Sequence, residues 1–310
     1  MKNLVLWLKV TVTTVLLVAS PILLFPDARH DLSFQSVEEL QDFIAWSAEK
    51  SPLIGAHRGG PTEGLPENAI VTFENALKYA PCLIEIDIRK TRDGVLILMH
   101  DSTLDRTTSG KGAVSQYSWK ELQHLYLKDT SGALTPYKIP SLKEVFDWAR
   151  GKAVLELDVK GAVQPEEIVS FIRRHQAEAF SIVITYSWKT ALQYHQLHPD
   201  LVISAPAYGV KGTRRLLESG IPYRNLIAFV GVREPDKRVY QLLHRHGIRA
   251  ILGTMGNLDR RARKRGPEVY LQLLENGADV LATGNVPLAA QAIHSFMKKK
   301  RLLPGLDWKE

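Results

Sequence analysis

The sequence predicts an α/β protein and, within that class, a (β/α)₈ TIM barrel. From residue 53 onward, short apolar runs alternate with amphipathic stretches of helical length, which is typical of parallel strands joined by helices. There are nine strand-like runs, one more than a barrel needs, and one of them follows its predecessor too closely for a helix to fit between. The G-x-G-x-x-G fingerprint of an open dinucleotide-binding sheet is absent from the sequence, which favours the closed barrel.

The predicted strands are short runs rich in apolar residues. They are Leu53–Ala56, Leu83–Ile88, Val95–Met99, Val154–Val159, Ile182–Thr185, Leu201–Ser204, Leu226–Val230, Ala250–Leu252 and Val280–Ala282. Helical patterns lie between most of these runs, and such alternation indicates βαβ units. The predicted helices are Glu67–Tyr79, Ser141–Arg150, Pro165–His175, Lys189–Leu197, Thr213–Ser219, Pro235–His246, Glu268–Asn276 and Val286–Lys298.

The extra strand is explained by a hairpin. Between Leu83–Ile88 and Val95–Met99 there is no room for a crossover helix, and Asp93-Gly94 is a strong turn signal. The second of these strands is therefore expected to fold back antiparallel on the first, which leaves eight parallel strands. Residues 102–140 carry turn residues and little apolar periodicity, so they are expected to form a small insertion over the barrel mouth.

The N-terminal hydrophobic segment stands apart from the barrel. An apolar run from Val10 to Phe25 follows Lys2 and Lys9, so residues 1–26 are expected to be a signal peptide or an uncleaved membrane anchor. A buried core helix is the third alternative. In the first two cases the lysines stay inside, and the main domain is membrane-anchored or secreted, on the outer side of the membrane.

The rest of the chain divides into three parts. Residues 27–50 are interpreted as a linker and an N-terminal helix, residues 51–298 as the barrel domain, and residues 299–310 as a C-terminal tail. Cys82 is the only cysteine, so the fold does not depend on an internal disulfide.

The charge of the chain fits an anionic partner. The formal net charge is +7, which suits phosphate esters or lipid head groups. The run Arg260–Arg265 is either a solvated helix end or loop, or a surface that attracts a membrane or substrate. Nucleic acid is not expected as a partner, because the basic residues do not gather with aromatic residues on one element.

Charged side chains cluster where the predicted strands end, and in a barrel these ends meet at one rim. Glu85 and Asp87 are two residues apart on one strand, so both carboxylates project from the same face. Such a pair at a barrel mouth is expected to hold a hard divalent cation, Mg²⁺ or Ca²⁺, which takes oxygen ligands. The alternative is a strand whose charges face water.

Two histidines are expected at the same rim. His57 follows the first strand, and His100 follows the hairpin strand. An isolated histidine more often has a structural role, but two of them beside a metal site suit paired acid and base catalysis. Arg58 offers a planar guanidinium group for phosphate oxygens.

Several short motifs follow one another through the first half of the barrel. They are His57-Arg58-Gly59, Pro66-Glu67-Asn68, Glu85-x-Asp87, Thr91-x-Asp93-Gly94, His100-Asp101, Leu104-Asp105-Arg106-Thr107-Thr108 and Ile139-Pro140-Ser141-Leu142. In order and spacing they resemble the glycerophosphodiester phosphodiesterase family. The resemblance is dense from Gly55 to about Gly161 and looser to Pro287, and it implies a barrel with a small insertion.

The resemblance implies a set of metal ligands. Glu85 and Asp87 would bind the cation, and Glu67 would shape the metal surroundings and is a further candidate metal ligand. The family usually has a glutamate where this chain has Asp158, which is one methylene shorter and is kept as the third ligand. Glu156, two residues earlier on the same face, is the reserve candidate.

The resemblance also implies catalytic and substrate-binding residues. His57 and His100 would transfer protons, while Arg58 and Lys160 would meet the phosphate. Trp188 stands where the family often has an aromatic residue against the substrate, although packing at a helix start explains it equally well.

The end of the last strand departs from the family pattern. The family tends to have Thr-Asp before a proline, whereas this chain has Thr283-Gly284-Asn285 before Val286 and Pro287. The rim therefore loses an acid, and the head-group pocket is the part of the site that this puts in doubt.

These observations predict a metal-dependent hydrolase that converts glycerophosphodiesters to glycerol 3-phosphate and an alcohol. One alternative is a lysophospholipase D that acts on lysophospholipids of a membrane. A second alternative is a non-catalytic barrel that binds phosphate or lipid. It is disfavoured because the histidines and acids of the rim are intact.

Overall fold

The computed structural model describes residues 30–302. The predicted signal peptide or anchor at residues 1–26 lies outside the described residues, as do residues 303–310 of the predicted tail. Among residues 30–302, no helix is both long enough and apolar enough to cross a membrane.

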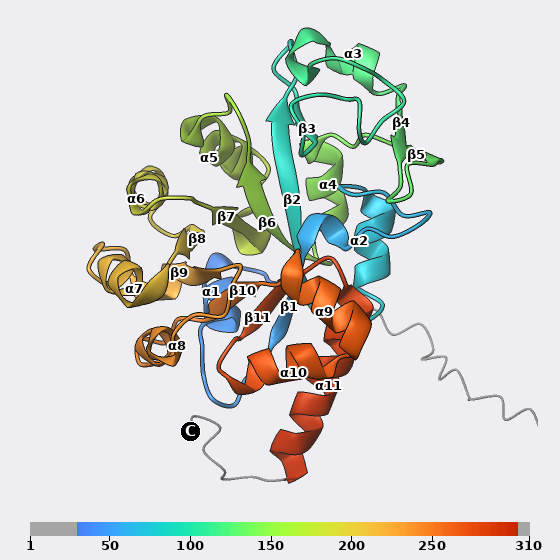
Figure 1. The fold of residues 1–310 in the computed structure, drawn as a ribbon. Coiled ribbons are helices and arrows are strands. Elements are labelled where there is room, and N and C mark those ends of the chain that lie inside the picture. Colours follow the sequence, from blue (N-terminus) through green and yellow to red (C-terminus); the bar gives the residue numbers. More distant parts are fainter. Residues whose placement is uncertain (1–29, 303–310) are drawn as a thin grey trace, which may run out of the picture.

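Eight parallel strands close into a barrel, which confirms the predicted (β/α)₈ TIM barrel (Figure 1). The strands are β1 (Leu53–Ala56), β2 (Cys82–Lys90), β6 (Val154–Val159), β7 (Ser181–Ile184), β8 (Val202–Pro206), β9 (Leu226–Gly231), β10 (Ala250–Gly253) and β11 (Val280–Thr283). The sheet closes because β1 pairs in parallel with both β11 and β2.

Helices surround the barrel and cover the outer faces of its strands (Figure 1). They are α2 (Ile70–Ala76), α4 (Leu142–Ala149), α5 (Pro165–Arg174), α6 (Trp188–Leu197), α7 (Gly209–Leu217), α8 (Lys237–His244), α9 (Asn257–Arg265), α10 (Glu268–Glu275) and α11 (Val286–Leu302). One further helix, α1 (Val37–Ile44), precedes the first strand.

Alternate residues of each strand point into the barrel. The layer nearest the start of the strands is apolar and includes Leu53, Leu83 and Val154. Leu40 and Ile44 of α1 are fully buried against this layer. The N-terminal helix therefore seals one end of the barrel, and the predicted site lies at the other end.

The hairpin and the insertion follow β2. β3 (Leu96–Leu98) pairs antiparallel with β2, as the turn signal predicted, and Gly94 takes a φ of 84° in the turn. The insertion contains α3 (Trp119–Leu122) and the antiparallel strands β4 (Tyr126–Lys128) and β5 (Leu134–Lys138), around a small apolar core of its own. Figure 1 shows it as a lobe near α2 and α4, beyond the end of β2.

The start of α2 differs from the prediction. The helix begins at Ile70, not at Glu67, because Asn68 takes a left-handed conformation with φ of 57°. A helix cannot include such a residue. The residues before Ile70 are used at the site instead.

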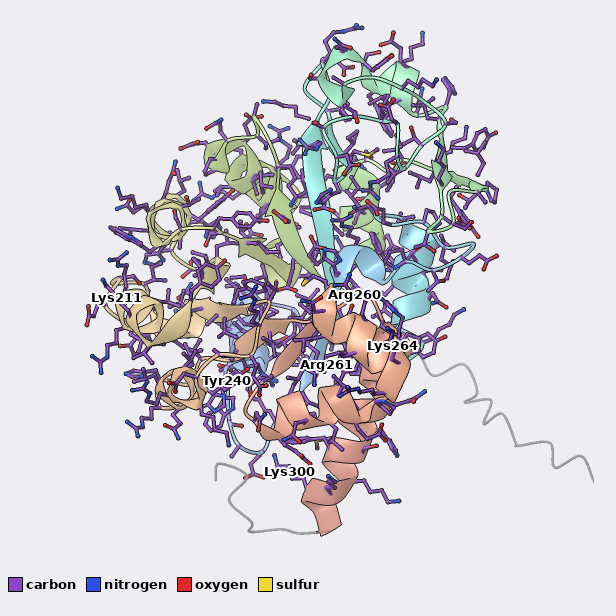
Figure 2. All side chains as sticks on the ribbon, in the orientation of Figure 1. Lys211, Tyr240, Arg260, Arg261, Lys264 and Lys300 are labelled. Carbon is purple, nitrogen blue, oxygen red and sulfur yellow. The ribbon has the colours of Figure 1, made fainter. Side chains whose placement is uncertain are left out.

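The helix α9 was not among the predicted helices. It buries only Leu258, Asp259 and Ala262, and its cationic side chains, with Arg260 and Arg261 among those labelled in Figure 2, are exposed. An acid in the first turn and three cations in the last turn complement the helix dipole. The run Arg260–Arg265 thus forms most of a solvated helix.

Candidate active site

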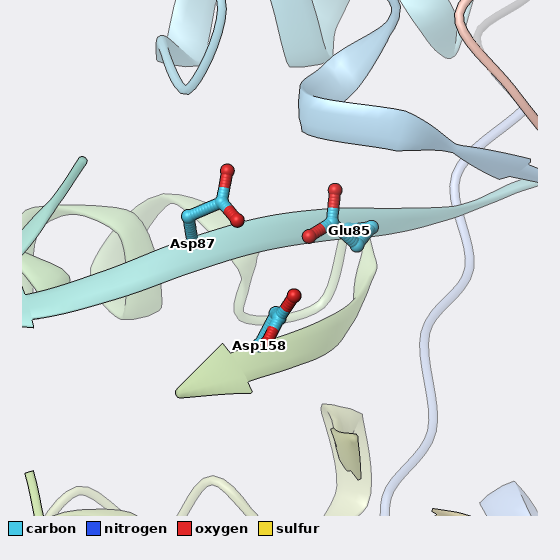
Figure 3. A group of neighbouring side chains, drawn as sticks. All are labelled: Glu85, Asp87 and Asp158. Carbon is cyan, nitrogen blue, oxygen red and sulfur yellow. The ribbon is translucent and has the colours of Figure 1, made fainter. Parts of the chain in front are cut away.

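Three acidic side chains meet at the carboxyl ends of two neighbouring strands (Figure 3). Glu85 and Asp87 come from β2 and Asp158 from β6, and Asp87 lies beside Asp158 in the strand register. One carboxylate oxygen of each residue lies within 4.8 Å of those of the other two, and all three residues are buried. The structure therefore brings these three predicted ligands together.

The three carboxylates of this acidic triad are close together and buried, so a nearby positive charge stabilises them. Burial raises the pKa of Glu85 well above its ordinary value, and the charges of Asp87 and Asp158 raise it further. Lys160 lies between the two aspartates: its Nζ donates to Asp158 Oδ2 at 2.5 Å and lies 3.2 Å from Asp87 Oδ1. Burial by itself would lower the pKa of Lys160, but the hydrogen bond to Asp158 raises it above its ordinary value.

The triad fits a divalent cation. Asp158 Oδ1 is buried and has no hydrogen-bond partner, and Asp87 Oδ1 has only its ion pair with Lys160, which leaves acceptors of the site available. Three neighbouring carboxylates, two of which already bind an ammonium group, supply the oxygen ligands that hard cations prefer. Glu85, Asp87 and Asp158 could therefore hold a metal ion.

Two residues in uncommon backbone conformations fix the triad. Arg58 lies in the 3₁₀ helix η1 (His57–Gly59) with φ of 53°, and its N–H donates to Glu85 Oε2 at 2.7 Å. Asn68 donates from Nδ2 to Asp87 Oδ2 at 2.8 Å and accepts from the Asp87 N–H at 2.9 Å. Such strained residues are often found at functional sites, where the surrounding structure holds them.

Glu67 lies apart from the acidic triad. Its carboxylate accepts hydrogen bonds from Arg58 Nη1 at 3.1 Å and from both terminal nitrogens of Arg106 at 2.9 Å. Glu67 was expected among the metal ligands, but in the structure both of its oxygens bind guanidinium groups. It positions Arg58 and ties the site to the insertion through Arg106.

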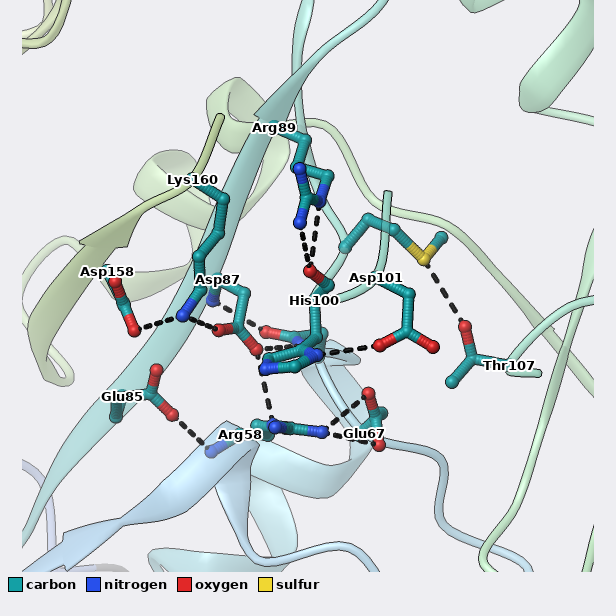
Figure 4. A network of polar contacts seen from close by, with 12 residues as sticks. Arg58, Glu67, Glu85, Asp87, Arg89, His100, Asp101, Thr107, Asp158 and Lys160 are labelled. Carbon is teal, nitrogen blue, oxygen red and sulfur yellow. Dashed lines mark hydrogen bonds and ion pairs between the residues drawn. The ribbon is translucent and has the colours of Figure 1, made fainter. Parts of the chain in front are cut away.

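A chain of polar contacts orients His100 (Figure 4). His100 Nδ1 lies 2.7 Å from Asp101 Oδ1, and Asp101 Oδ2 accepts from Arg106 Nε at 2.6 Å. The Arg106 hydrogen bond holds the pKa of Asp101 well below its ordinary value. Arg89 donates from Nε and Nη2 to the carbonyl oxygen of His100. Because Nδ1 faces Asp101, Nε2 is the nitrogen left for a substrate.

His57 has different surroundings. It begins η1 directly after β1, next to Arg58. Burial lowers the pKa of His57 to about 4, and the charges of Arg58 and His100 also lower it. His57 is therefore neutral at neutral pH and able to accept a proton.

Comparison with known proteins identifies the family. Residues 57–280 match the glycerophosphoryl diester phosphodiesterase family, which is most of the chain. The chain belongs to this family. A crystal structure of a glycerophosphoryl diester phosphodiesterase from Parabacteroides distasonis has a TM-score of 0.81 and 33% sequence identity, and the match covers 90% of this chain and 96% of that one.

Two curated members of the family match over shorter stretches. The glycerophosphodiester phosphodiesterase of Caldanaerobacter subterraneus subsp. tengcongensis is 30% identical over 158 residues, 49% of this chain and 65% of the relative. That of Bacillus altitudinis is 31% identical over 163 residues, 49% of this chain and 64% of the relative.

Strand β6 carries two acids on one face, Glu156 and Asp158. The shorter Asp158 still reaches the triad, and Tyr186 donates from its hydroxyl to Asp158 Oδ2 at 2.6 Å. Glu156, the reserve candidate, lies beside Glu85 in the register and is not part of the triad. Burial, and then the charge of Asp158, raise the pKa of Glu156 to about 7.

Four residues of the site were not predicted as functional. Asn68, Asp101 and Arg106 stand in the family motifs, which could have identified them. Tyr186 stands two residues before Trp188, to which the aromatic role was assigned. In the structure Tyr186 reaches the triad, whereas Trp188 begins α6 and its ring lies 5.9 Å from Nζ of Lys189.

An acid from another element lies at the end of β11, where the family pattern has Thr-Asp. Asp259, in the first turn of α9, is buried and accepts from the Thr283 hydroxyl at 2.9 Å and the Gly284 N–H at 3.2 Å. The Tyr270 hydroxyl donates to the same carboxylate at 2.8 Å. The rim thus has an acid at this position, but its hydrogen bonds hold the loop after β11.

Proposed function

We propose that the protein hydrolyses glycerophosphodiesters to glycerol 3-phosphate and a free alcohol, in a reaction that depends on a divalent cation. The observation that carries the proposal is the acidic triad of Glu85, Asp87 and Asp158, in a member of the glycerophosphoryl diester phosphodiesterase family. His57 and His100 on the same rim support it, because hydrolysis needs a proton acceptor and a proton donor.

The triad would hold the cation, and carboxylate ligands suit Mg²⁺ or Ca²⁺. When bound, the cation supplies positive charge against the phosphoryl oxygens of the substrate. Lys160 now lies against Asp87 and Asp158, and it would turn towards a phosphate oxygen once the aspartates have another partner. Arg58, which Glu67 holds in place, is the second cationic side chain available to the phosphate.

The two histidines would share the proton transfers. One takes a proton from the nucleophile, which is water or the 2-hydroxyl of the glycerol, and the other gives a proton to the leaving alcohol. Neutral His57 suits the acceptor, and His100, held at Nδ1 by Asp101, can present Nε2 to either oxygen. The family resemblance favours attack by the 2-hydroxyl through a cyclic phosphate, after which the histidines exchange roles.

The place of this reaction is proposed from residues 1–26, which the structure does not describe. We keep the proposal that the main domain is anchored or secreted on the outer side of a membrane. Protease added to cells from which any outer membrane has been removed would digest such a domain, and full protection of a folded protein would contradict it.

The decisive experiment measures release of glycerol 3-phosphate from glycerophosphocholine with Mg²⁺, with Ca²⁺ and with a chelator. The Glu85→Ala/Asp87→Ala variant is expected to lose the metal-dependent rate by at least a hundredfold, because two of three ligands are gone. The matched control is Glu49→Ala/Glu218→Ala, which removes two exposed acids outside the site. Absence of release by a folded wild-type protein under every condition would favour the lysophospholipase D alternative first, and then the non-catalytic barrel.

A further inference from the structure

A further cationic side chain, Arg89, lies at the rim. Arg89 stands two residues after Asp87 on β2, so it projects from the same face of the strand as Glu85 and Asp87. Two residues of a strand span about 7 Å, and Arg89 stands that much further towards the solvent than Asp87. The residue is partly exposed. Arg89 therefore faces the mouth of the barrel, on the solvent side of the triad.

The guanidinium group of Arg89 lies between two groups of the proposed reaction. On one side, Nε and Nη2 donate to the carbonyl oxygen of His100 at 2.9 and 2.6 Å, as Figure 4 shows. On the other side, a methyl group added at Gly161, the residue after Lys160, would lie 3.1 Å from Nη1. The guanidinium group thus lies between the histidine proposed to transfer protons and the chain segment that carries the phosphate-binding lysine.

The charge of Arg89 has no carboxylate partner, in contrast to the other cations of the site. Each of those cations lies against two carboxylates. The pairs are Arg58 with Glu67 and Asp87, Arg106 with Glu67 and Asp101, and Lys160 with Asp87 and Asp158. Within residues 30–302, Arg89 forms no ion pair, and its hydrogen bonds go only to a neutral carbonyl oxygen. Its Nη1 is therefore a donor left for a ligand.

The acids around Arg89 are engaged elsewhere. Burial lowers the pKa of its guanidinium group, and the charges of Asp87, Asp101 and Asp158 act in the opposite direction. Arginine keeps its proton in either case. Asp101 already accepts from Arg106, while Asp87 and Asp158 would bind the divalent cation. The positive charge of Arg89 is thus available in a partly desolvated place, where it acts more strongly than in water.

We propose that Arg89 binds an anionic group on the alcohol side of the substrate, so that the enzyme prefers glycerophosphodiesters whose leaving alcohol carries a carboxylate. This inference rests on the proposed phosphodiesterase function and names its substrate class. Glycerol offers only neutral hydroxyls, whereas a hydrogen bond from a guanidinium group to a carboxylate is about twice as strong as one between neutral groups.

The position of Arg89 suits a carboxylate near the phosphate. With the phosphate at the triad, the leaving alcohol lies towards the solvent, beside the histidine that exchanges a proton with it. In a seryl head group, an oxygen and a short carbon chain join the carboxylate to the phosphorus. This separation matches the step along β2 from Asp87 to Arg89.

The reaction on such a substrate keeps the same chemistry. The oxygen of water ends bound to phosphorus, directly or after attack by the 2-hydroxyl of the glycerol. The bond from phosphorus to the seryl oxygen breaks, and that oxygen receives a proton. The products are glycerol 3-phosphate and serine. Arg89 transfers no proton and binds the carboxylate throughout.

The test uses two substrates that differ only in this carboxylate. Glycerophosphoserine and glycerophosphoethanolamine share the glycerol, the phosphate and the ammonium group, so the ratio of their kcat/KM values isolates the contact with the carboxylate. Release of glycerol 3-phosphate measures both rates. For the wild-type protein the ratio is expected to be at least about tenfold in favour of glycerophosphoserine, because a hydrogen bond to a charged group contributes about 10- to 100-fold.

Arg89→Gln removes the charge and places an amide nitrogen where Arg89 has Nε, so it can still donate to the carbonyl oxygen of His100. This variant is expected to bring the ratio close to one, chiefly by raising KM for glycerophosphoserine. Lys90→Gln is the matched control, because it makes the same change of charge at the next position. Lys90 projects from the opposite face of β2 and pairs with Glu167, so its replacement should leave the ratio unchanged.

Each failure has its own signature. A wild-type ratio near one would overturn this inference and leave the proposed function standing. Equal losses on both substrates in Arg89→Gln would overturn it too, because Arg89 would then act only by holding the backbone of His100. If neither substrate is hydrolysed, the proposed function fails, and calorimetric titration of both substrates with Mg²⁺ present still tests Arg89: equal affinities overturn the inference.

Discussion

At the scale of single residues, His57 and His100 show how surroundings separate two identical side chains. His57 is largely buried beside the guanidinium group of Arg58, which disfavours a second positive charge. His100 is about one-third exposed and has the carboxylate of Asp101 at Nδ1. The two histidines that are proposed to share the proton transfers therefore have unequal surroundings.

The buried neutral His57 gives a prediction about acid stability. An unfolded histidine takes up a proton near pH 6.5, whereas folded His57 does so only near its pKa of about 4. Between these values the unfolded chain binds more protons, so stability is full above pH 6.5 and falls towards pH 4. In the presence of chelator, the free energy of unfolding of His57→Gln is expected to fall less than that of the wild type between pH 6.5 and pH 4, by up to about 3 kcal/mol.

Urea unfolding at pH 7, 5.5 and 4 measures this effect. The exposed His124→Gln serves as the control, and it should follow the wild-type protein at every pH. Parallel stability curves for His57→Gln and the wild type would show that His57 is not held neutral.

Some of these residues could be predicted from the sequence and others could not, for a physical reason. Glu85 and Asp87 were found because the period of a strand places them on one face. Arg106 binds Glu67 across 39 residues, and no local pattern encodes such a contact. Tyr186 belongs to the same class, because its partner Asp158 stands on a neighbouring element.

At the scale of elements, the segment before α2 is not helical, and its residues contact the site instead. The predicted helix included Asn68, but its left-handed backbone allows the side chain to bind both the carboxylate and the N–H of Asp87. Helical propensity competes here with a tertiary contact, and the tertiary contact prevails.

Two substitutions separate the roles of Asn68. Glycine accepts the left-handed backbone but lacks the amide, whereas alanine loses both. Asn68→Gly is therefore expected to weaken binding of Mg²⁺ or Ca²⁺ about 10- to 100-fold, and Asn68→Ala at least as much. Isothermal titration measures the affinities, with Asn276→Ala at the end of α10 as the control. Unchanged metal affinity in Asn68→Gly would show that the amide does not orient Asp87.

The prediction missed two elements, each for a different reason. The helix α9 is mostly charged and buries only three residues, so its sequence shows no clear helical period of apolar residues. The β4–β5 pair of the insertion is short and packs into a separate small core. The barrel strands were predicted closely because they are buried on both sides, and their apolar runs leave little ambiguity.

At the scale of the whole molecule, one end of the barrel is sealed by α1 and the other is open and charged at its border. The first turn of α9 lies at this mouth, since Asp259 binds Gly284, and Gly284 lies close to Gly60 after η1. The helix exposes five cations there, and its one acid is buried. Figure 2 shows Arg260, Arg261 and Lys264 on α9, whereas Lys211 lies on the more distant α7.

This placement predicts electrostatic attraction of the mouth to an anionic lipid surface. Each basic residue near such a surface contributes about 1 kcal/mol, so Arg260→Glu/Arg261→Glu is expected to weaken binding to phosphatidylglycerol vesicles roughly thirtyfold or more. Vesicle sedimentation at several salt concentrations measures it, and the affinity should fall as salt rises. Arg214→Glu/Arg215→Glu, in the last turn of α7, carries the same charge change away from the mouth. Equal losses in both variants would mean that net charge alone, and not the position of α9, sets the attraction.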